Sequence, residues 1–330
     1  MADELEDKIK FLAERAFDTG AIRINLDEPF VTNNKTQVPI SSHLGFMLEY
    51  PSDRKLCADA MERIITQRVG RFDAVCSTTT LGLMQASAFA RKFSYPLFAL
   101  NGNESYEINY NGFNLESPGD VNYIVSGSRL ATPYSTFVAD SLGLKLSYIK
   151  ARDGEKANGG RKLPHPAKED KVLLVVSDED QECVDDTLSS VRDEFDKRRE
   201  MNVSEKTLRV DDFIKKADVM GKRILIFGAL FDYDGYFSAD FKHYKDAGAK
   251  DITSVHLVGY GLADSNLAMR KIGCINRNVL GLDYLADVAF NTGRINSEER
   301  RRLIDWRKNP SRWGAKYGFP RVNSKTAWFL

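Results

Sequence analysis

A small-residue turn and a basic loop carry residue types that could hold an anion. The turn Ser126-Gly127-Ser128-Arg129 ends an apolar run, and the backbone N–H groups of such a turn can face a phosphate. The loop 151–171 is polar and rich in lysine and glycine; it contains Arg152 and Lys156, and Lys150 precedes it. The turn could hold an anion or could equally well serve sheet-to-helix packing, and the loop is expected to be exposed.

An acidic run follows the apolar segment 172–176. It contains Asp178, Glu179 and Asp180, at the place where a strand would end. Carboxylates there can hold a divalent cation, and they are also favoured at the start of a helix by its dipole. Both interpretations stay open on the sequence.

Short apolar runs alternate with helical patterns along most of the chain. This alternation predicts βαβ units and a largely parallel sheet, which places ligands at the carboxyl ends of its strands. The predicted strands are 73–76, 97–100, 122–125, 145–149, 172–176, 223–227 and 252–258. The predicted helices are 53–67, 81–93, 130–142, 183–199 and 236–247, and 101–120 is expected to be a loop.

Composition narrows the class of protein. The 330 residues include 47 basic and 47 acidic ones, and 42% are hydrophobic, which is typical of a globular protein with a real core. The balanced charge argues against nucleic acid or an anionic membrane as the main partner. We find no apolar stretch long enough to span a membrane and no secretory signal. The four cysteines and four histidines match no metal or redox motif, so we expect a cytoplasmic protein with reduced thiols.

Two segments of the chain resemble each other. Residues 74–100 align without gaps on residues 123–149, and Ser77 falls on Ser126. Each copy predicts a strand, a polar turn, a helix and a second strand. The likeness indicates either a duplicated unit or the general similarity of any two βαβ units.

The N-terminal residues resemble the hood of a known family. The following residues stand at the positions of its motif: Gly20-Ala21-Ile22, Phe30, Thr32, Lys35, Pro39, Tyr50-Pro51 and Arg54. The family is the orotate phosphoribosyltransferases, which have the type I phosphoribosyltransferase fold. The resemblance implies an α/β fold with a mostly parallel sheet flanked by helices and an N-terminal hood, and the charged helical pattern at 297–307 predicts a C-terminal helical appendage. We expect 1–70 to hold the first helix and hood, 71–262 the core, which could be two fused half-units, and 263–330 the appendage.

The resemblance also implies roles for individual residues. Lys156-Ala157-Asn158-Gly159 matches the mobile-loop pattern K-x-H-G with Asn in place of His, which makes Lys156 the lysine that closes over pyrophosphate. Asp178 and Asp180 would lie under the ribose and bind Mg²⁺, and all three are expected to be catalytic. Ser126, Gly127, Ser128, Arg129, Lys150 and Arg152 would hold the phosphates.

The loop that binds phosphoribosyl pyrophosphate (PRPP) in this family has no intact copy here. The family pattern is an apolar strand, two acids and then Thr-Thr-Gly-Gly at the start of a helix. Segment 172–188 has the acids without the Thr-Thr-Gly turn. Segment 224–249 keeps Gly235, but Gly228-Ala229 stand where the acids belong. The segment at 123–149 is a third and weaker candidate.

Two functions follow from these observations. The first is a phosphoribosyltransferase-like protein of nucleotide metabolism that binds PRPP or a nucleotide-like molecule, needs Mg²⁺ if it is catalytic, and forms a homo-oligomer such as a dimer. The alternative is a non-catalytic protein of the same fold that serves as a binding, regulatory or structural subunit, and the sequence leaves catalysis open. A third idea, contact with nucleic acid through the arginines and tryptophans of 300–317, has little support from the rest of the chain.

Overall fold

The fold was obtained as a computed structural model. It describes residues 2–31, 37–77, 79–101, 104–110, 123–126, 131–148, 172–176, 206–209, 214–231 and 236–319.

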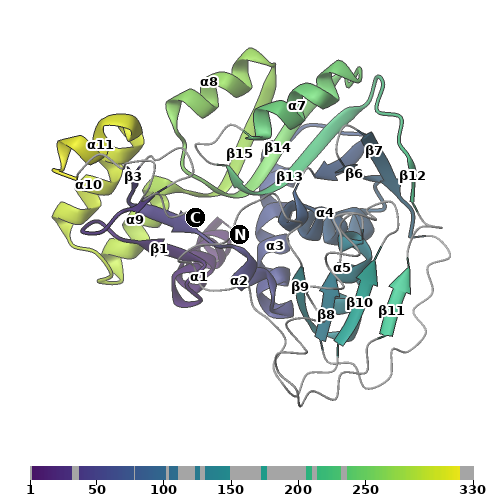
Figure 1. Ribbon diagram of the computed structural model, residues 1–330, viewed down its shortest axis with the longest axis horizontal. Helices are drawn as coiled ribbons and strands as arrows, with labels where there is room; N and C mark the ends of the chain where they lie inside the picture. Colours follow the sequence, from purple (N-terminus) through teal and green to yellow (C-terminus); the bar gives the residue numbers. More distant parts are fainter. Residues whose placement is uncertain are drawn as a thin grey trace.

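A seven-stranded sheet forms the centre of the molecule (Figure 1). Five of its strands run parallel to one another: β6, β5, β13, β14 and β15. At one edge, β7 pairs antiparallel with β6, and β12 pairs antiparallel with β7. In spatial order the strands are β12 (Ile214–Lys216), β7 (Glu104–Ile108), β6 (Leu97–Asn101), β5 (Ala74–Ser77), β13 (Arg223–Phe231), β14 (Asp251–Gly259) and β15 (Cys274–Gly281). The predicted α/β class with a mostly parallel sheet is confirmed.

A second sheet of four strands lies beside the first (Figure 1). All of its neighbouring strands pair in parallel. In spatial order they are β11 (Lys206–Arg209), β10 (Val172–Val176), β8 (Tyr123–Ser126) and β9 (Lys145–Tyr148). The sequence predicted three of these strands but not that they form a sheet of their own.

Helices cover both faces of the large sheet. Ile224 and Ile226 of β13 pack toward α7 (Tyr236–Asp246) and α8 (Ala263–Lys271). The intervening residue Leu225 faces the opposite way, toward α3 (Pro51–Arg68) and α4 (Thr80–Phe93). Side chains alternate along a strand, so β13 contributes to both hydrophobic layers. This is why its sequence is a continuous apolar run.

Local sequence explains where several helices begin and end. Pro51 occupies the first turn of α3, where its missing N–H costs nothing. The Thr79 hydroxyl caps α4 by accepting from the Gly82 N–H at 3.1 Å. The helix α5 (Thr132–Leu142) ends at Gly143, whose positive φ of 66° suits glycine.

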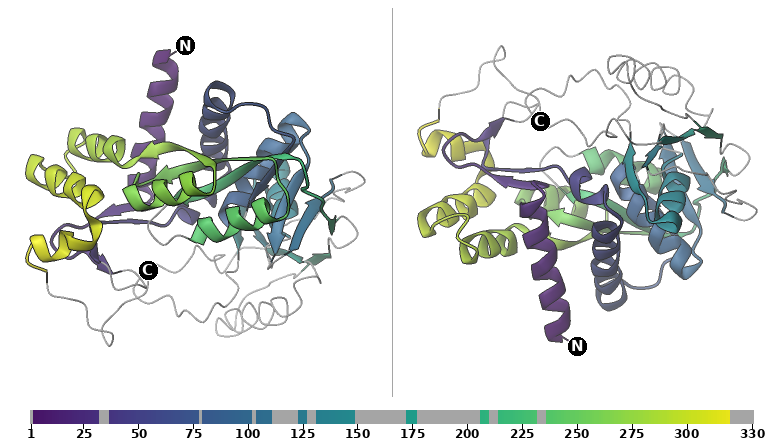
Figure 2. Two further views of the ribbon diagram at one scale, coloured as in Figure 1. Left: turned by 90° about the horizontal axis from the view of Figure 1, so that it is seen from above. Right: turned by 90° about the horizontal axis from the view of Figure 1, so that it is seen from below.

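The N-terminal residues form a helix and a hood. The helix α1 (Ala2–Asp18) projects from the body of the molecule (Figure 2). We call the described residues between 20 and 48 the hood. Its elements are β1 (Ile22–Ile24), β2 (Phe30–Val31), β3 (Gln37–Val38), β4 (Ile40–Ser42) and α2 (Gly45–Leu48). The pairs β1–β4 and β2–β3 are both antiparallel.

A C-terminal group of helices packs against the hood. It consists of α9 (Leu282–Asn291), α10 (Ser297–Lys308) and α11 (Pro310–Lys316). Gly314 lies so close to Gln37 of the hood that an added Cβ would come within 2.0 Å of Oε1. The appendage is therefore in direct contact with the hood. The division of the chain at residues 70 and 262 stays a prediction.

The expectation that 101–120 forms a loop is wrong in part. The segment 101–120 was expected to be a loop, yet it contains β7, in which Tyr106 and Ile108 are buried while Ser105 and Glu107 are only partly so. This alternation has the period of a half-buried strand.

Among the described residues, no helix has the length and apolar character of a membrane span.

Candidate functional site

One face of the hood carries three polar side chains close together. Arg23 on β1 lies directly opposite Ser41 on β4, and His43 follows two residues later. The Arg23 Nη2 lies 3.1 Å from the His43 Nε2, and its guanidinium is 5.4 Å from the centre of the Phe30 ring. The neighbouring residues Ile22 and Ile40 are buried in the core. The hood thus has an apolar face and a polar face.

The charge state of this group follows from its hydrogen bonds. Arginine has no acceptor and stays charged, so the His43 Nε2 must accept the bond from Arg23. Burial and the nearby Arg23 charge lower the pKa of His43, which keeps the imidazole neutral. The polar face therefore carries one net positive charge.

Two buried polar atoms on this face have no protein partner. Within the part of the chain that the structure describes, the Arg23 Nε and the Ser41 Oγ are buried and make no hydrogen bond. Ser41 is only 4% exposed. A buried donor without a partner costs about 1–3 kcal/mol. A cation and a hydroxyl held in this way suit an incoming anion such as a carboxylate or a phosphate.

Neighbouring contacts hold the hood over the carboxyl end of the sheet. The Ser42 hydroxyl lies 2.8 Å from the hydroxyl of Tyr260, the residue that follows β14. Tyr260 in turn meets the buried Trp306 of α10 edge to face, with ring centres 5.4 Å apart. The Arg302 guanidinium donates to the Leu26 carbonyl. The hood is thus fixed both to the sheet and to the C-terminal helices.

The turn after β5 is tightly packed. The buried Ser77 hydroxyl donates to the Phe227 carbonyl of β13 at 2.7 Å and accepts from the Thr79 N–H at 3.2 Å. An added Cβ on Gly82 would lie 2.1 Å from the Ser77 Oγ and 2.4 Å from the Phe227 oxygen. Only glycine lets α4 approach the sheet this closely.

A polar cluster lies on β14 and β15 among otherwise apolar residues. The His256 Nδ1 is 2.8 Å from the Asn276 Oδ1, which also accepts from the Ser254 hydroxyl at 3.0 Å. The Asn276 amide reaches Asn278 at 3.3 Å. Burial lowers the pKa of His256 to about 4, and the bond to Asn276 opposes that shift only in part. Sequence analysis missed this cluster because its members lie on two strands whose pairing is not evident from the sequence.

His256 also limits the size of the residue that can stand at position 228 of β13. Gly228 pairs with His256, and a Cβ on Gly228 would lie 2.1 Å from the imidazole Cδ2. In the PRPP-loop pattern, the first of the two acids stands at the position of Gly228. An aspartate at 228 would collide with the histidine ring, so the strand is built around glycine here.

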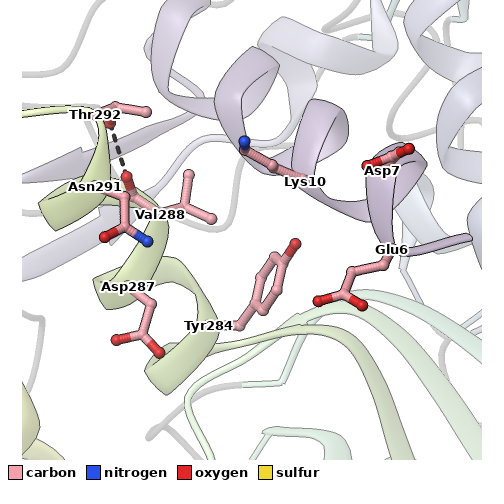
Figure 3. A pocket seen from close by; sticks show the side chains of 8 residues that line it. All are labelled: Glu6, Asp7, Lys10, Tyr284, Asp287, Val288, Asn291 and Thr292. Atoms are coloured by element: carbon pink, nitrogen blue, oxygen red, sulfur yellow. Dashed lines mark hydrogen bonds between the residues drawn. The ribbon is translucent and has the colours of Figure 1, made fainter. Parts of the chain in front are cut away.

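A separate pocket of about 500 Å³ lies between α1 and α9. Figure 3 shows the Tyr284 ring between the two helices, with Lys10 and Glu6 reaching from α1. Its other lining residues are Asp7, Asp287, Val288, Asn291 and Thr292. It contains none of the hood residues above.

Most of the site residues expected from the sequence lie outside the described residues. They are Gly127, Ser128, Arg129, Lys150, Arg152, Lys156, Asp178 and Asp180. Ser126 is described: it is fully buried at the end of β8, and its hydroxyl lies 3.0 Å from the Thr132 hydroxyl. Among the described residues, no group of three or more His, Cys, Asp or Glu side chains could hold a metal ion.

Both tryptophans of 300–317 and most of its basic side chains take part in packing or ion pairs. Trp306 and Trp313 are each 1% exposed, so neither ring is available to stack a base. Arg302 stacks on Tyr317 at 5.0 Å. Other basic side chains of the segment pair with acids: Arg300 with Asp287, Arg301 with Glu298, Arg307 with Asp283 and Lys316 with Asp305.

No protein-family model matches the sequence. Orotate phosphoribosyltransferases from two strains of Listeria monocytogenes, of serovar 1/2a and serotype 4b, are each 19% identical to it over 305 residues. The alignment covers 92% of this chain and 98% of each relative.

Solved structures of similar proteins include a UMP synthase from Leishmania donovani, with a TM-score of 0.49 and 14% identity over 90% of this chain. This chain covers 41% of that longer protein. An orotate phosphoribosyltransferase from Aeropyrum pernix has a TM-score of 0.40 and 14% identity, covering 86% of this chain and 99% of its own. The chain is thus similar, at low identity, to orotate phosphoribosyltransferases along nearly its whole length.

Proposed function

We propose that this chain is a phosphoribosyltransferase-like protein of nucleotide metabolism that binds an anionic nucleobase or nucleotide at its hood. One observation carries the proposal: the Arg23 Nε and the Ser41 Oγ are buried side by side on paired strands and have no hydrogen-bond partner among the described residues. A bound carboxylate or phosphate would accept from both.

A carboxylated pyrimidine is the ligand class that fits best. Arg23 offers a charged donor, Ser41 a hydroxyl and Phe30 an aromatic ring within one hood face. Orotate is a planar pyrimidine that carries a carboxylate, and it appears in the names of the similar proteins. A neutral base would leave the charge of the partly buried Arg23 without a counter-charge.

We further propose that a catalytic form of the chain transfers the phosphoribosyl group of PRPP to the base and releases pyrophosphate. Lys156 would close over the pyrophosphate, while Asp178 and Asp180 would hold the ribose and Mg²⁺. The metal would supply charge neutralisation of the pyrophosphate. The phosphate contacts would come from Ser126, Gly127, Ser128, Arg129, Lys150 and Arg152. Location in the cytoplasm stays a prediction from the cysteine usage, and assembly into a homo-oligomer such as a dimer stays a prediction of the family resemblance.

The packing of Gly228 favours a second candidate function. His256 fills the space that an acid on β13 would need, so this copy of the PRPP-loop pattern cannot acquire the family's acids without rebuilding β14. If the acids at 178–180 do not serve in their place, the chain would bind a nucleotide without turning it over. It would then act as a binding, regulatory or structural subunit.

Calorimetric titration of the full chain with orotate and with orotidine monophosphate tests the hood site. We expect binding of at least one of them, weakened roughly tenfold or more by Arg23→Gln, because a hydrogen bond to a charged group contributes about 1.5–3 kcal/mol. Arg68→Gln changes an exposed arginine on α3 and serves as the matched control. No heat with either ligand, or equal affinity in the two variants, would remove the hood proposal.

Product formation separates the two candidate functions. The chain is incubated with PRPP, Mg²⁺ and orotate, and nucleotide is detected by chromatography. Turnover that falls about a hundredfold or more in Lys156→Ala and Asp178→Asn supports the enzyme. Ligand binding without any product supports the non-catalytic alternative.

A further inference from the structure

The two sheets of this protein share one strand order. In the large sheet the four strands β6, β5, β13 and β14 are adjacent and parallel. In the small sheet β9, β8, β10 and β11 are adjacent and parallel in the corresponding order. In each set the strand that comes first in the chain, β5 or β8, occupies the second position in the sheet. The next strand in the chain, β6 or β9, follows through a single helix, α4 or α5, and lies at the first position.

The registers of the paired strands also correspond. The gapless alignment of 74–100 on 123–149 places β5 on β8 and β6 on β9. Val75 pairs with Leu97 in one sheet, and their aligned counterparts Ile124 and Leu146 pair in the other. The third strand lies on the same side in both sheets, because Ala74 of β5 pairs with Ile224 of β13 and Tyr123 of β8 pairs with Val172 of β10. A chance resemblance of two βαβ units does not require a shared register.

The connecting helices are buried in the same pattern. In α4 the residues 82–87, 89 and 90 are buried, and 88 and 91 are partly exposed. The aligned positions 131–136, 138 and 139 are buried around α5, and 137 and 140 are partly exposed. Each helix therefore has two buried sides, one of which packs against its own sheet.

The second buried side of each helix meets the other helix. The Ser87 hydroxyl of α4 reaches the Pro133 carbonyl of α5 at 3.1 Å, and the Arg91 guanidinium lies 4.4 Å from the centre of the Phe137 ring. Under the alignment, Ser87 corresponds to Thr136 and Pro133 to Met84. The two helices thus touch through the same face, which is how the two halves of a symmetric dimer meet.

The chain leaves the large sheet and returns to it at two neighbouring strands. β7 precedes the small sheet and β12 follows it, and these two strands pair antiparallel, with Ile108 opposite Ile214. The residues between them therefore have the form of an insertion into a complete first unit.

We propose that β8, α5, β9, β10 and β11 are a second copy of the unit formed by β5, α4, β6, β13 and β14, packed on the first copy through equivalent faces of α4 and α5. The chain is an internal pair, and the face of α4 that would pack on a second copy of the unit is already covered by α5 of the same chain. It is therefore a monomer in solution, in place of the dimer that the family resemblance predicts. This inference depends on the fold alone and stands or falls independently of the proposed ligand.

The oligomeric state is the first test. Sedimentation equilibrium of the full chain, from low to high micromolar concentration, is expected to give one species at the monomer mass of 37.2 kDa. A dimer in that range would overturn the proposal.

A cross-link tests the symmetry itself. If the helices meet through equivalent faces, the contact between Ser87 and Pro133 has a counterpart between Met84 and Thr136. Mild oxidation of the variant Met84→Cys/Thr136→Cys is expected to form a disulfide within one chain, seen as a shifted monomer on a non-reducing gel. The two single variants are the controls. Circular dichroism shows whether the double variant is folded, and a folded variant that forms no disulfide would refute the equivalent packing. Should that variant not fold, the sedimentation measurement on the unmodified chain decides the proposal.

Discussion

The Tyr260 hydroxyl lies 2.8 Å from the Ser42 hydroxyl, and the two residues are 218 positions apart in the chain. One belongs to the carboxyl end of the large sheet and the other to the hood. Since Tyr260 also packs against the buried Trp306, a single side chain connects the hood, the sheet and the C-terminal helices.

We expect this bond to couple the hood to the sheet. Tyr260→Phe and Ser42→Ala should each lower the free energy of unfolding by about 0.5–1.5 kcal/mol, because each loses one hydrogen bond. The double variant should cost clearly less than the two single effects together, as a double-mutant cycle from urea unfolding would show. Strict additivity would mean that the two hydroxyls do not interact.

Removing the Arg54 side chain should lower the free energy of unfolding strongly. Its guanidinium is buried, lies 2.8 Å from the Asp140 carboxylate and also donates to the carbonyls of Leu48, Glu49 and Leu144. Arg54→Ala leaves these acceptors without their donor, so we expect a loss of about 3–5 kcal/mol in the free energy of unfolding.

The adjacent Lys55 offers a matched control for Arg54. It pairs with Asp59 on the exposed side of the same helix, at 2.7 Å. Lys55→Ala should change the free energy of unfolding by less than about 1 kcal/mol, because exposed pairs contribute little. Similar losses in the two variants would contradict the structural role given to Arg54.

Gly82→Ala tests the close approach of α4 to the sheet. The new methyl group would meet the Ser77 Oγ and the Phe227 carbonyl, so we expect a loss of about 1–3 kcal/mol despite the better helix propensity of alanine. Gly70→Ala, where nothing lies within 4 Å of the added Cβ, should stay within about 0.5 kcal/mol of the parent or be slightly more stable. Thermal unfolding of both variants gives the comparison.

His256 should make the stability of the fold depend on pH. Its pKa is lowered from 6.5 to about 4 by burial, so between these values the unfolded chain binds a proton that the folded chain does not. Stability should therefore fall as the pH decreases through this window, by roughly 3 kcal/mol at most, and this contribution should be constant above it.

The variant His256→Gln removes the titrating group. Urea unfolding at several pH values should show a flatter decrease of stability for the variant than for the parent. An unchanged slope would mean that other groups account for the acid sensitivity.

Local patterns were enough to locate most of the core strands. The run Val172–Val176 forms a strand with the predicted limits, and the run that begins at Arg223 forms β13. Short apolar runs bounded by polar residues have few other ways to be buried. The alternation of such runs with helical patterns likewise predicted the parallel sheet.

Partner choice between these strands was not available from the sequence. β13 pairs with β5, 150 positions earlier, and not with β10, although all three are apolar. The sequence also offered no sign that Gly228 and His256 face each other. Such pairings depend on side chains that meet only after the chain has folded.

The sequence by itself determined the alternation of strands and helices, the resemblance of the N-terminal residues to the hood motif of the orotate phosphoribosyltransferases, and the likeness of two internal segments. Only the tertiary structure decided that the strands form two sheets of the same order, and that Arg23, Ser41 and His43 share one face of the hood. The reason is physical: a local pattern reports whether a segment is buried and with what period, whereas a binding site requires contacts between segments that are distant in the chain.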